Sequence, residues 1–329
     1  MKSRRKLIVG LLIVIVTLAS AFGLYLNRPL AIEPQPATFT CLDESDGKLV
    51  PFEPQPANIY GVGLSFAKHI NETASEFDPS ADPPIFRKAL HSLTRHDADV
   101  AIPSVSDIQQ AVEQLEPGIT KQLQDYKDMP VLLDYETELG FVLLEDVSSE
   151  DLKEPDFAPP IGFFVGNDLS ARCLAVLGEG RTNRYEYWGV SKSFPGFLPV
   201  SEQIWVPQEY REDAIPCVRL KTLVNDEVRQ SQMTSDMIYT PLQMLQAIHR
   251  KYPDTALKKN DLILMGTPGG VALSTPRWLM RLAGIVGLDR FSKLDAAIGK
   301  ADNGRFLKSG DHVRVSGEWL GSVGVTLSN

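Results

Sequence analysis

The chain is 329 residues long, which exceeds the usual size of a single hydrophobic core but still permits one large mixed domain. Its formal net charge of -9 argues against a nucleic-acid-binding protein, because affinity for a phosphate backbone depends on clustered lysine and arginine. The three cysteines lack C-x-x-C spacing, so we expect neither a structural zinc site nor a disulfide framework, and at most one disulfide.

The N-terminal segment, residues 1–27, combines a basic cluster with a long apolar run. Residues 7–26 carry no charge, and as a helix they would span roughly 30 Å, the thickness of a bilayer core. We therefore predict a single transmembrane helix, with the rest of the chain on the non-cytoplasmic side of the membrane, which is the periplasm in a bacterium. The alternative is a signal peptide cleaved near Ala19-Ser20-Ala21, which would give a secreted protein. The basic cluster, which should stay cytoplasmic, consists of Lys2, Arg4, Arg5 and Lys6.

Residues 28–57 are rich in proline and lack periodicity, so we predict an extended spacer there, followed by one folded domain over residues 58–329. Strand patterns outnumber helical patterns in this domain, and no regular helical crossovers separate them. This favours a mixed, β-rich fold over a doubly wound sheet. The expected strands lie at 59–65, 131–145, 162–167, 219–224, 227–230, 261–266 and 312–327, and the expected helices at 66–75 and 241–251.

Two segments, near 105–129 and 277–305, interrupt this strand pattern. The first is polar and helical in character. The second places apolar residues among basic ones, as in an amphipathic helix that either packs on its own domain or touches a membrane surface.

The strongest candidate site lies on the strand that carries Glu136 and Glu138. Side chains two residues apart on a strand point to the same face, so the two carboxylates converge within an apolar frame. Burying two like charges is costly unless a cation offsets their repulsion, although a solvated strand face would also explain the pair. Asp168 follows another apolar strand, where it is either a turn former or a third acid. Together the three acids would suit Mg²⁺, with Mn²⁺ or Ca²⁺ also acceptable.

Other polar residues could complete such a site. His69 and Glu72 lie three apart on a predicted helix, where a carboxylate-held histidine can act as a general base, or where the two form only a surface pair. Lys192 stands in a β-like stretch and is either functional or solvated. Gly266 and Thr267 begin a Gly-rich turn that could bind an anion or serve only as a turn.

The identity and order of these motifs resemble the fumarylacetoacetate hydrolase family, and in particular its short, acylpyruvase-like members, from residue 59 to residue 329. The opening segment resembles the family's glycine-led H-x-x-E, and residues 134–139 resemble its D-Y-E-x-E-L. The remaining matches are F-x-K at 86–88, N-D-x-S-A-R at 167–172, K-S-F at 192–194, N-G-E-x-x-Q at 225–230 with T-S-D-M-I at 234–238, G-T-P-x-G-V at 266–271, and L-K-x-G-D ending at 311.

The resemblance implies a β-sandwich roll with peripheral helices that forms a homodimer. It implies Mg²⁺ or Mn²⁺ at Glu136, Glu138 and Asp168, and water activation by His69 with Glu72. Lys192, as a catalytic residue, and Arg172 would face the substrate's oxygens, while Gly266 and Thr267 would bind the substrate.

The activity implied by the resemblance is hydrolysis of a C–C bond in a small acylpyruvate-like (2,4-dioxo) acid. Alternatives on the same scaffold are a decarboxylase, a hydratase or an isomerase of a 2-oxo acid. Cys173 and Ala175 stand where the family usually has an acid and a glutamine. This departure motivates a third possibility, a catalytically silent protein that binds a metal and a 2-oxo acid.

Overall fold

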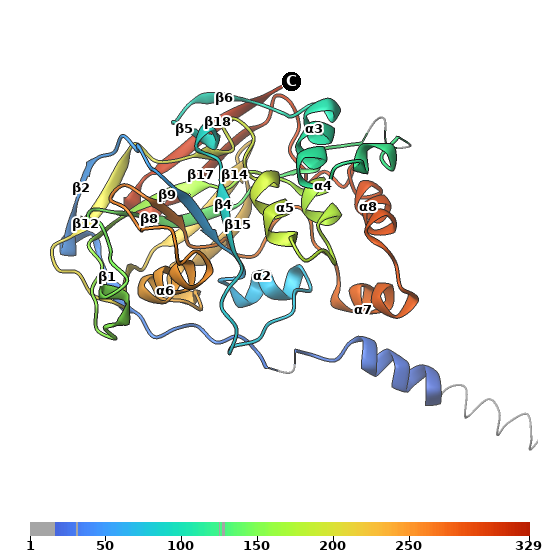
Figure 1. Cartoon of the computed structure of the whole chain (residues 1–329), viewed down its shortest axis with the longest axis horizontal. Coiled ribbons are helices and arrows are strands. Elements are labelled where there is room, and N and C mark those ends of the chain that lie inside the picture. The colour runs from blue at the N-terminus through green and yellow to red at the C-terminus, as the bar shows by residue number, and fades with distance from the viewer. Residues whose placement is uncertain (1–16, 31, 125, 127–128) are drawn as a thin grey trace, which may run out of the picture.

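The computed structural model describes residues 17–30, 32–124, 126 and 129–329. Two sheets dominate this part of the chain (Figure 1). The larger has the order β2-β12-β9-β8-β16-β3-β4, and the smaller has the order β15-β14-β17-β18-β6. The strands of the larger sheet are β2 (Gly47–Pro51), β12 (Gln203–Pro207), β9 (Ile161–Asn167), β8 (Thr137–Leu143), β16 (Leu262–Leu264), β3 (Ile59–Val62) and β4 (Ile85–Lys88). Those of the smaller sheet are β15 (Glu227–Met233), β14 (Arg219–Val224), β17 (His312–Gly317), β18 (Ser322–Ser328) and β6 (Ala98–Ala101).

Three short strand pairs complete the β structure of the described residues. They are β1 (Thr40–Leu42) with β13 (Ala214–Pro216), β7 (Leu133–Asp134) with β10 (Ser170–Ala171), and β5 (Leu93–Thr94) with β11 (Leu198–Pro199). The predicted β-rich mixed fold is therefore confirmed.

The two main sheets enclose an apolar core, to which β8 and β9 contribute Phe141 and Phe163 and the smaller sheet contributes Val315. Every residue of β8 and of β9 is buried, which explains why their sequences are apolar on both faces. Close packing also requires a glycine in β8. A Cβ at Gly140 would lie 2.3 Å from the ring of Phe164, its partner across the strand pair.

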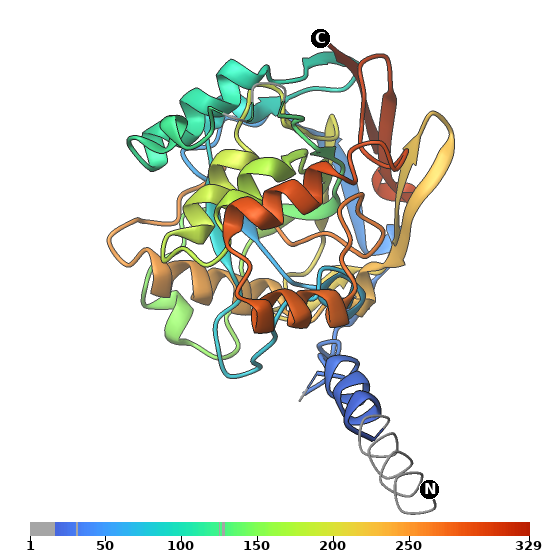
Figure 2. The same ribbon diagram turned by 90° about the vertical axis from the view of Figure 1, so that its right-hand side faces the viewer.

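Most of the α-helices lie on the side of the sheets that faces the viewer in Figure 2, whereas the helix over residues 241–251 lies away from that side, toward the left in Figure 1. Their bounds are α2 (Ala67–Glu72), α3 (Val105–Leu115), α4 (Arg172–Leu177), α5 (Arg184–Ser191), α6 (Pro241–Lys251), α7 (Arg277–Val286) and α8 (Arg290–Ile298). Short 3-10 helices are η1 (Glu44–Asp46), η2 (Leu90–Ser92), η3 (Ile119–Lys121), η4 (Asp151–Lys153), η5 (Thr234–Asp236) and η6 (Glu318–Leu320). The helix expected at 241–251 begins with a capping box, in which Thr240 and Gln243 bond each other's backbone N–H groups.

The two interrupting segments contact each other. Glu116, at the end of α3, accepts two hydrogen bonds of 2.6 Å from the guanidinium of Arg290 on α8, and a third of 2.7 Å from the Tyr187 hydroxyl. These bonds hold the pKa of Glu116 at about 2, against the opposing effect of partial burial. Leu294 of α8 is fully buried in a second core together with Val112 of α3. The second segment therefore packs on its own domain.

The predicted spacer, residues 28–57, contributes two strands to the domain. β2 pairs with β12 in the larger sheet, and β1 pairs with β13 in parallel. A disulfide between Cys41 and Cys217 joins β1 to the residue that follows β13. It uses two of the three cysteines, while Cys173 is free and buried.

The predicted transmembrane helix over residues 7–26 is wrong for the described chain. No helix among the described residues combines the length and the apolar character needed to cross a membrane. Residues 7–16 lie outside the described residues, and the helix over 17–26 rises only about 15 Å, half the thickness of a bilayer core. The single-pass membrane localisation depended on this helix and is corrected with it.

The Cys41–Cys217 bond makes a testable contribution to stability. It closes a loop of 176 residues, so its loss should lower the free energy of unfolding by about 2–4 kcal/mol, because the unfolded chain gains freedom. We expect the double variant Cys41→Ser/Cys217→Ser to show this loss in urea unfolding. Dithiothreitol should destabilise the unsubstituted protein by the same amount and leave the variant unchanged. Equal effects of the reductant on both proteins would contradict the prediction.

Candidate active site

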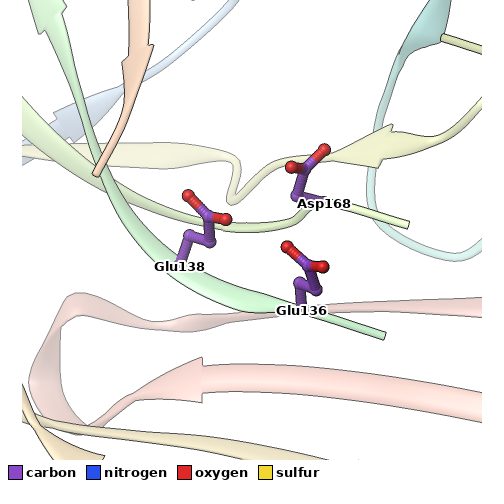
Figure 3. A group of neighbouring side chains, drawn as sticks. All are labelled: Glu136, Glu138 and Asp168. Atoms are coloured by element: carbon purple, nitrogen blue, oxygen red, sulfur yellow. The ribbon is translucent and has the colours of Figure 1, made fainter. Parts of the chain in front are cut away.

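Three acidic side chains meet where β8 and β9 lie side by side (Figure 3). Glu136 precedes β8, Glu138 lies within it, and Asp168 directly follows β9. The antiparallel register pairs Thr137 with Asn167, which places the two glutamates beside Asp168. Carboxylate oxygens of the three residues lie within 4.8 Å of one another, and their exposed fractions are only 4%, 2% and 0%. The structure thus brings together the acids that the sequence singled out, and it buries them.

Fixed cations balance most of this buried negative charge. The Lys192 ammonium lies 2.7 Å from Glu136 Oε2 and 2.6 Å from Asp168 Oδ2. Arg172 pairs with Asp134 at 2.7 Å and with Glu136 at 2.5 Å. Burial alone would raise the pKa of Glu136, but the charges of Lys192, Arg172 and His69 hold it at about 2.

Glu138 is the exception to this balance. Among the described residues it forms no ion pair, and its carboxylate accepts one hydrogen bond of 2.7 Å, from the backbone N–H of Gly266. Burial, together with the charges of Asp168 and Glu136, raises the pKa of Glu138 well above its ordinary value. A cluster of carboxylate oxygens in which one acid lacks a cationic partner is the chemistry that suits a hard divalent cation. The residues present therefore fit the expected Mg²⁺ or Mn²⁺.

A buried lysine, Lys88, forms an ion pair with Asp168. Lys88, at the end of β4, is fully buried at its side chain and lies 2.5 Å from Asp168 Oδ1. It also donates to the backbone carbonyl of Lys192, and so links Asp168 to the segment that carries the second lysine. In the sequence, Lys88 stood out only as the last residue of F-x-K at 86–88, and no role was predicted for it. A lysine at the end of a mostly buried strand could have indicated a buried ion pair.

Two further polar residues were missed in the sequence. Asp134 accepts hydrogen bonds from the backbone N–H groups of Ala272 and Leu273, at 2.7 and 3.2 Å, and so fixes the loop after β16. The side-chain amide of Gln230 donates to Thr267 Oγ1 at 2.9 Å, while its oxygen accepts from the backbone N–H of Thr137 at 3.0 Å. Both residues position groups that face the site.

His69 and Glu72 form the expected pair on α2, with 3.0 Å between Nδ1 and Oε1. Glu72 also accepts a 2.7 Å hydrogen bond from the backbone N–H of Gly270, which fixes its carboxylate. In a neutral imidazole, donation from Nδ1 to Glu72 leaves Nε2 as the proton acceptor.

A cavity of about 240 Å³ joins these groups. It is lined by seven of the nine residues singled out in the sequence: His69, Glu136, Glu138, Arg172, Lys192, Gly266 and Thr267. The other two, Glu72 and Asp168, bond directly to lining residues. One cavity therefore presents carboxylates, cations, a hydroxyl and an imidazole to a small polar molecule.

Comparison with known proteins was made on both sequence and structure. The family model described as fumarylacetoacetate (FAA) hydrolase C-terminal matches residues 58–328. Oxaloacetate tautomerase YisK of Bacillus subtilis (strain 168) is 27% identical over 232 residues, which are 69% of this chain and 64% of that protein. The mitochondrial oxaloacetate decarboxylase of Dictyostelium discoideum is 27% identical over 245 residues, or 74% of this chain and 94% of that protein.

A solved structure shares the fold. It is the fumarylpyruvate hydrolase of Pseudomonas aeruginosa in complex with Mn²⁺ and pyruvate, with a TM-score of 0.52 and 16% identity. The match covers 91% of this chain and 99% of that one.

The buried pair between Lys88 and Asp168 predicts a large stability effect. Lys88→Met should cost about 3 kcal/mol of unfolding free energy, because it leaves part of a buried carboxylate without its partner. Lys153→Met is the matched control, since Lys153 pairs with Glu150 where both side chains are exposed, by 66% and 77%. That change should cost less than about 1 kcal/mol. Similar losses for the two variants in urea unfolding would contradict the assignment.

Proposed function

Because this chain belongs to the fumarylacetoacetate hydrolase family, we propose that it is a metal-dependent enzyme that hydrolyses a C–C bond in a small acylpyruvate-like (2,4-dioxo) acid. The observation that carries the proposal is the shared cavity, where Glu136 and Glu138 of the buried acidic cluster line the same space as His69, which is held by Glu72.

Glu136, Glu138 and Asp168 are the proposed metal ligands, for Mg²⁺ or Mn²⁺, with Ca²⁺ chemically acceptable. The bound ion would supply Lewis acidity to the oxygens of a 2-oxo acid. The similar fold of a fumarylpyruvate hydrolase that holds Mn²⁺ and pyruvate is consistent with this choice.

Cationic and hydroxyl groups of the chain would orient the substrate. Lys192 and Arg172 line the cavity and place fixed positive charge where negative charge develops on the substrate's oxygens as the C–C bond breaks. Thr267 Oγ1 accepts a hydrogen bond from Gln230 and donates only a long one, 3.5 Å, to the Pro268 carbonyl, so its proton can turn to a substrate carboxylate. Gly266 lines the cavity beside Glu138, to which its backbone N–H donates a hydrogen bond.

The His69–Glu72 pair would activate water. Nε2 of His69 takes a proton from water, whose oxygen then attacks the carbonyl remote from the 2-oxo acid, while Glu72 stabilises the charged imidazole. The C–C bond breaks, one fragment leaves as a carboxylic acid, and the other takes a proton at carbon to become pyruvate.

A second candidate is tautomerisation or decarboxylation of oxaloacetate, which the names of two relatives favour. Neither reaction adds water to the substrate, so neither requires His69 to deliver it. The silent metal- and 2-oxo-acid-binding protein would bind pyruvate without turnover. The homodimer implied by the resemblance stays a prediction.

His69→Asn tests the proposed reaction. With Mn²⁺ and acetylpyruvate, the unsubstituted protein should release pyruvate, and the variant should lose roughly 10²–10⁴-fold in kcat, because its general base is gone. His91→Asn is the control, since His91 is exposed and lies outside the cavity.

Retention of full hydrolysis by His69→Asn would contradict the assignment of the base. Release of carbon dioxide from oxaloacetate without hydrolysis of acetylpyruvate would favour the second candidate instead. Binding of pyruvate with no turnover of either compound would favour the silent protein.

A further inference from the structure

The cavity extends well beyond the groups assigned to chemistry. From the acids it continues to α7, to the turn after it and to α8, all within the second interrupting segment. Figures 1 and 2 show these two helices on the same side of the domain as α4 and α5. The reaction proposed above uses no residue of this outer part.

Apolar side chains form the walls of the outer part. Leu279, Met280 and Ala283 come from α7, and Leu288 comes from the turn that follows it. From the opposite direction α4 contributes Ala175 and Val176. Ala175 stands where the family resemblance led us to expect a glutamine. The smaller apolar side chain leaves more space in the cavity and removes a polar group from its wall.

The two lysines of the outer part are already engaged. Lys300 Nζ donates to the carbonyl of Ser274 at 2.9 Å and to Thr275 Oγ1 at 3.2 Å. Lys293 lies 3.6 Å from a carboxylate oxygen of Glu179. Because these partners already stabilise both ammonium groups, a second carboxylate on a substrate would gain less from them than from unpaired lysines, whereas an apolar group would contact the apolar walls directly.

The outer wall is fixed relative to the proposed base. The backbone N–H of Thr275 donates to the carbonyl of Glu72 at 3.0 Å, and Arg277 donates to Asn71 Oδ1 at 2.8 Å. At its other end the segment is held by the pair between Arg290 and Glu116 and by the buried Leu294. The wall therefore lies at a defined distance from α2, as a specificity pocket requires.

We propose that α7, α8 and α4 form a specificity pocket that selects 2-oxo acids with an apolar tail over those with a second carboxylate. This inference rests on the proposed function, because it takes the carboxylates and cations as the place where the 2-oxo acid group is bound. The preferred substrate is then an acylpyruvate with an alkyl or aryl acyl group, rather than oxaloacetate or fumarylpyruvate.

The affinity for a homologous series of 2-oxo acids tests whether the pocket binds apolar tails, and it does not require turnover. We would titrate the full chain, with Mn²⁺ present, with pyruvate, 2-oxobutyrate, 2-oxohexanoate and 2-oxooctanoate by calorimetry. Each buried methylene should tighten binding by about fourfold, because burying it removes apolar surface from water. The dissociation constant of oxaloacetate should be no lower than that of pyruvate.

Two variants locate the effect. Met280→Glu should abolish the gain in affinity with tail length, because it places a charge in the apolar wall. Ala175→Gln should stop the gain at a shorter tail. Ile285→Glu is the control, since Ile285 lies on the same helix but is 53% exposed and outside the cavity.

The outcomes separate the two proposals. If pyruvate binds but longer tails bring no gain, or if Met280→Glu and Ile285→Glu behave alike, the specificity pocket is overturned while the proposed function stands. Tighter binding of oxaloacetate than of 2-oxohexanoate would also overturn it. If no 2-oxo acid binds at all, the proposed function fails, and the pocket assignment fails with it.

Discussion

The balance of buried charge where β8 meets β9 constrains the rest of this domain. Four acids converge there, Asp134, Glu136, Glu138 and Asp168, and three cations oppose them, Lys88, Lys192 and Arg172. Each cation is supplied by a different part of the chain: β4, the residue after α5, and the start of α4. Because an unpaired buried charge is strongly destabilising, the sheet and the helices must come together correctly to satisfy it. Glu138 is the acid left without a cationic partner, and burial beside Asp168 and Glu136 raises its pKa; a divalent cation would supply the missing positive charge.

The sequence predicted the centre of this arrangement better than its surroundings. Glu136 and Glu138 could be found because their spacing on an apolar strand allows only one common face, and because the motifs resemble those of a known family. No role was predicted for Lys88, because its role depends on an ion pair with Asp168, which lies 80 residues further along the chain. The Cys41–Cys217 bond likewise depends on the β1–β13 pairing, which no local pattern indicates.

Apolar composition was misleading at the N-terminus for a physical reason. Hydropathy over residues 7–26 records how favourable a bilayer would be for these side chains, but it does not record contacts with the rest of the chain. The described helix over 17–26 ends where the Arg281 guanidinium bonds the carbonyl of Leu26 at 3.0 Å. This contact ties the segment to α7. Proline content was similarly a weak guide over residues 28–57, because β2 tolerates Pro51 at the end of an edge strand.

The common scaffold and the additions to it have separate roles in this account. We propose that the sheets and the buried charges provide the site for a cation and a 2-oxo acid, and that α7 and α8 select the substrate. The most direct test of the central claim is calorimetric titration of Mn²⁺ into the metal-free protein and into Glu138→Gln. We expect saturable binding of a single ion to the unsubstituted chain and at least a tenfold weaker affinity in the variant, because it lacks one of the three carboxylates. Equal affinities, or no binding to the unsubstituted chain, would contradict it.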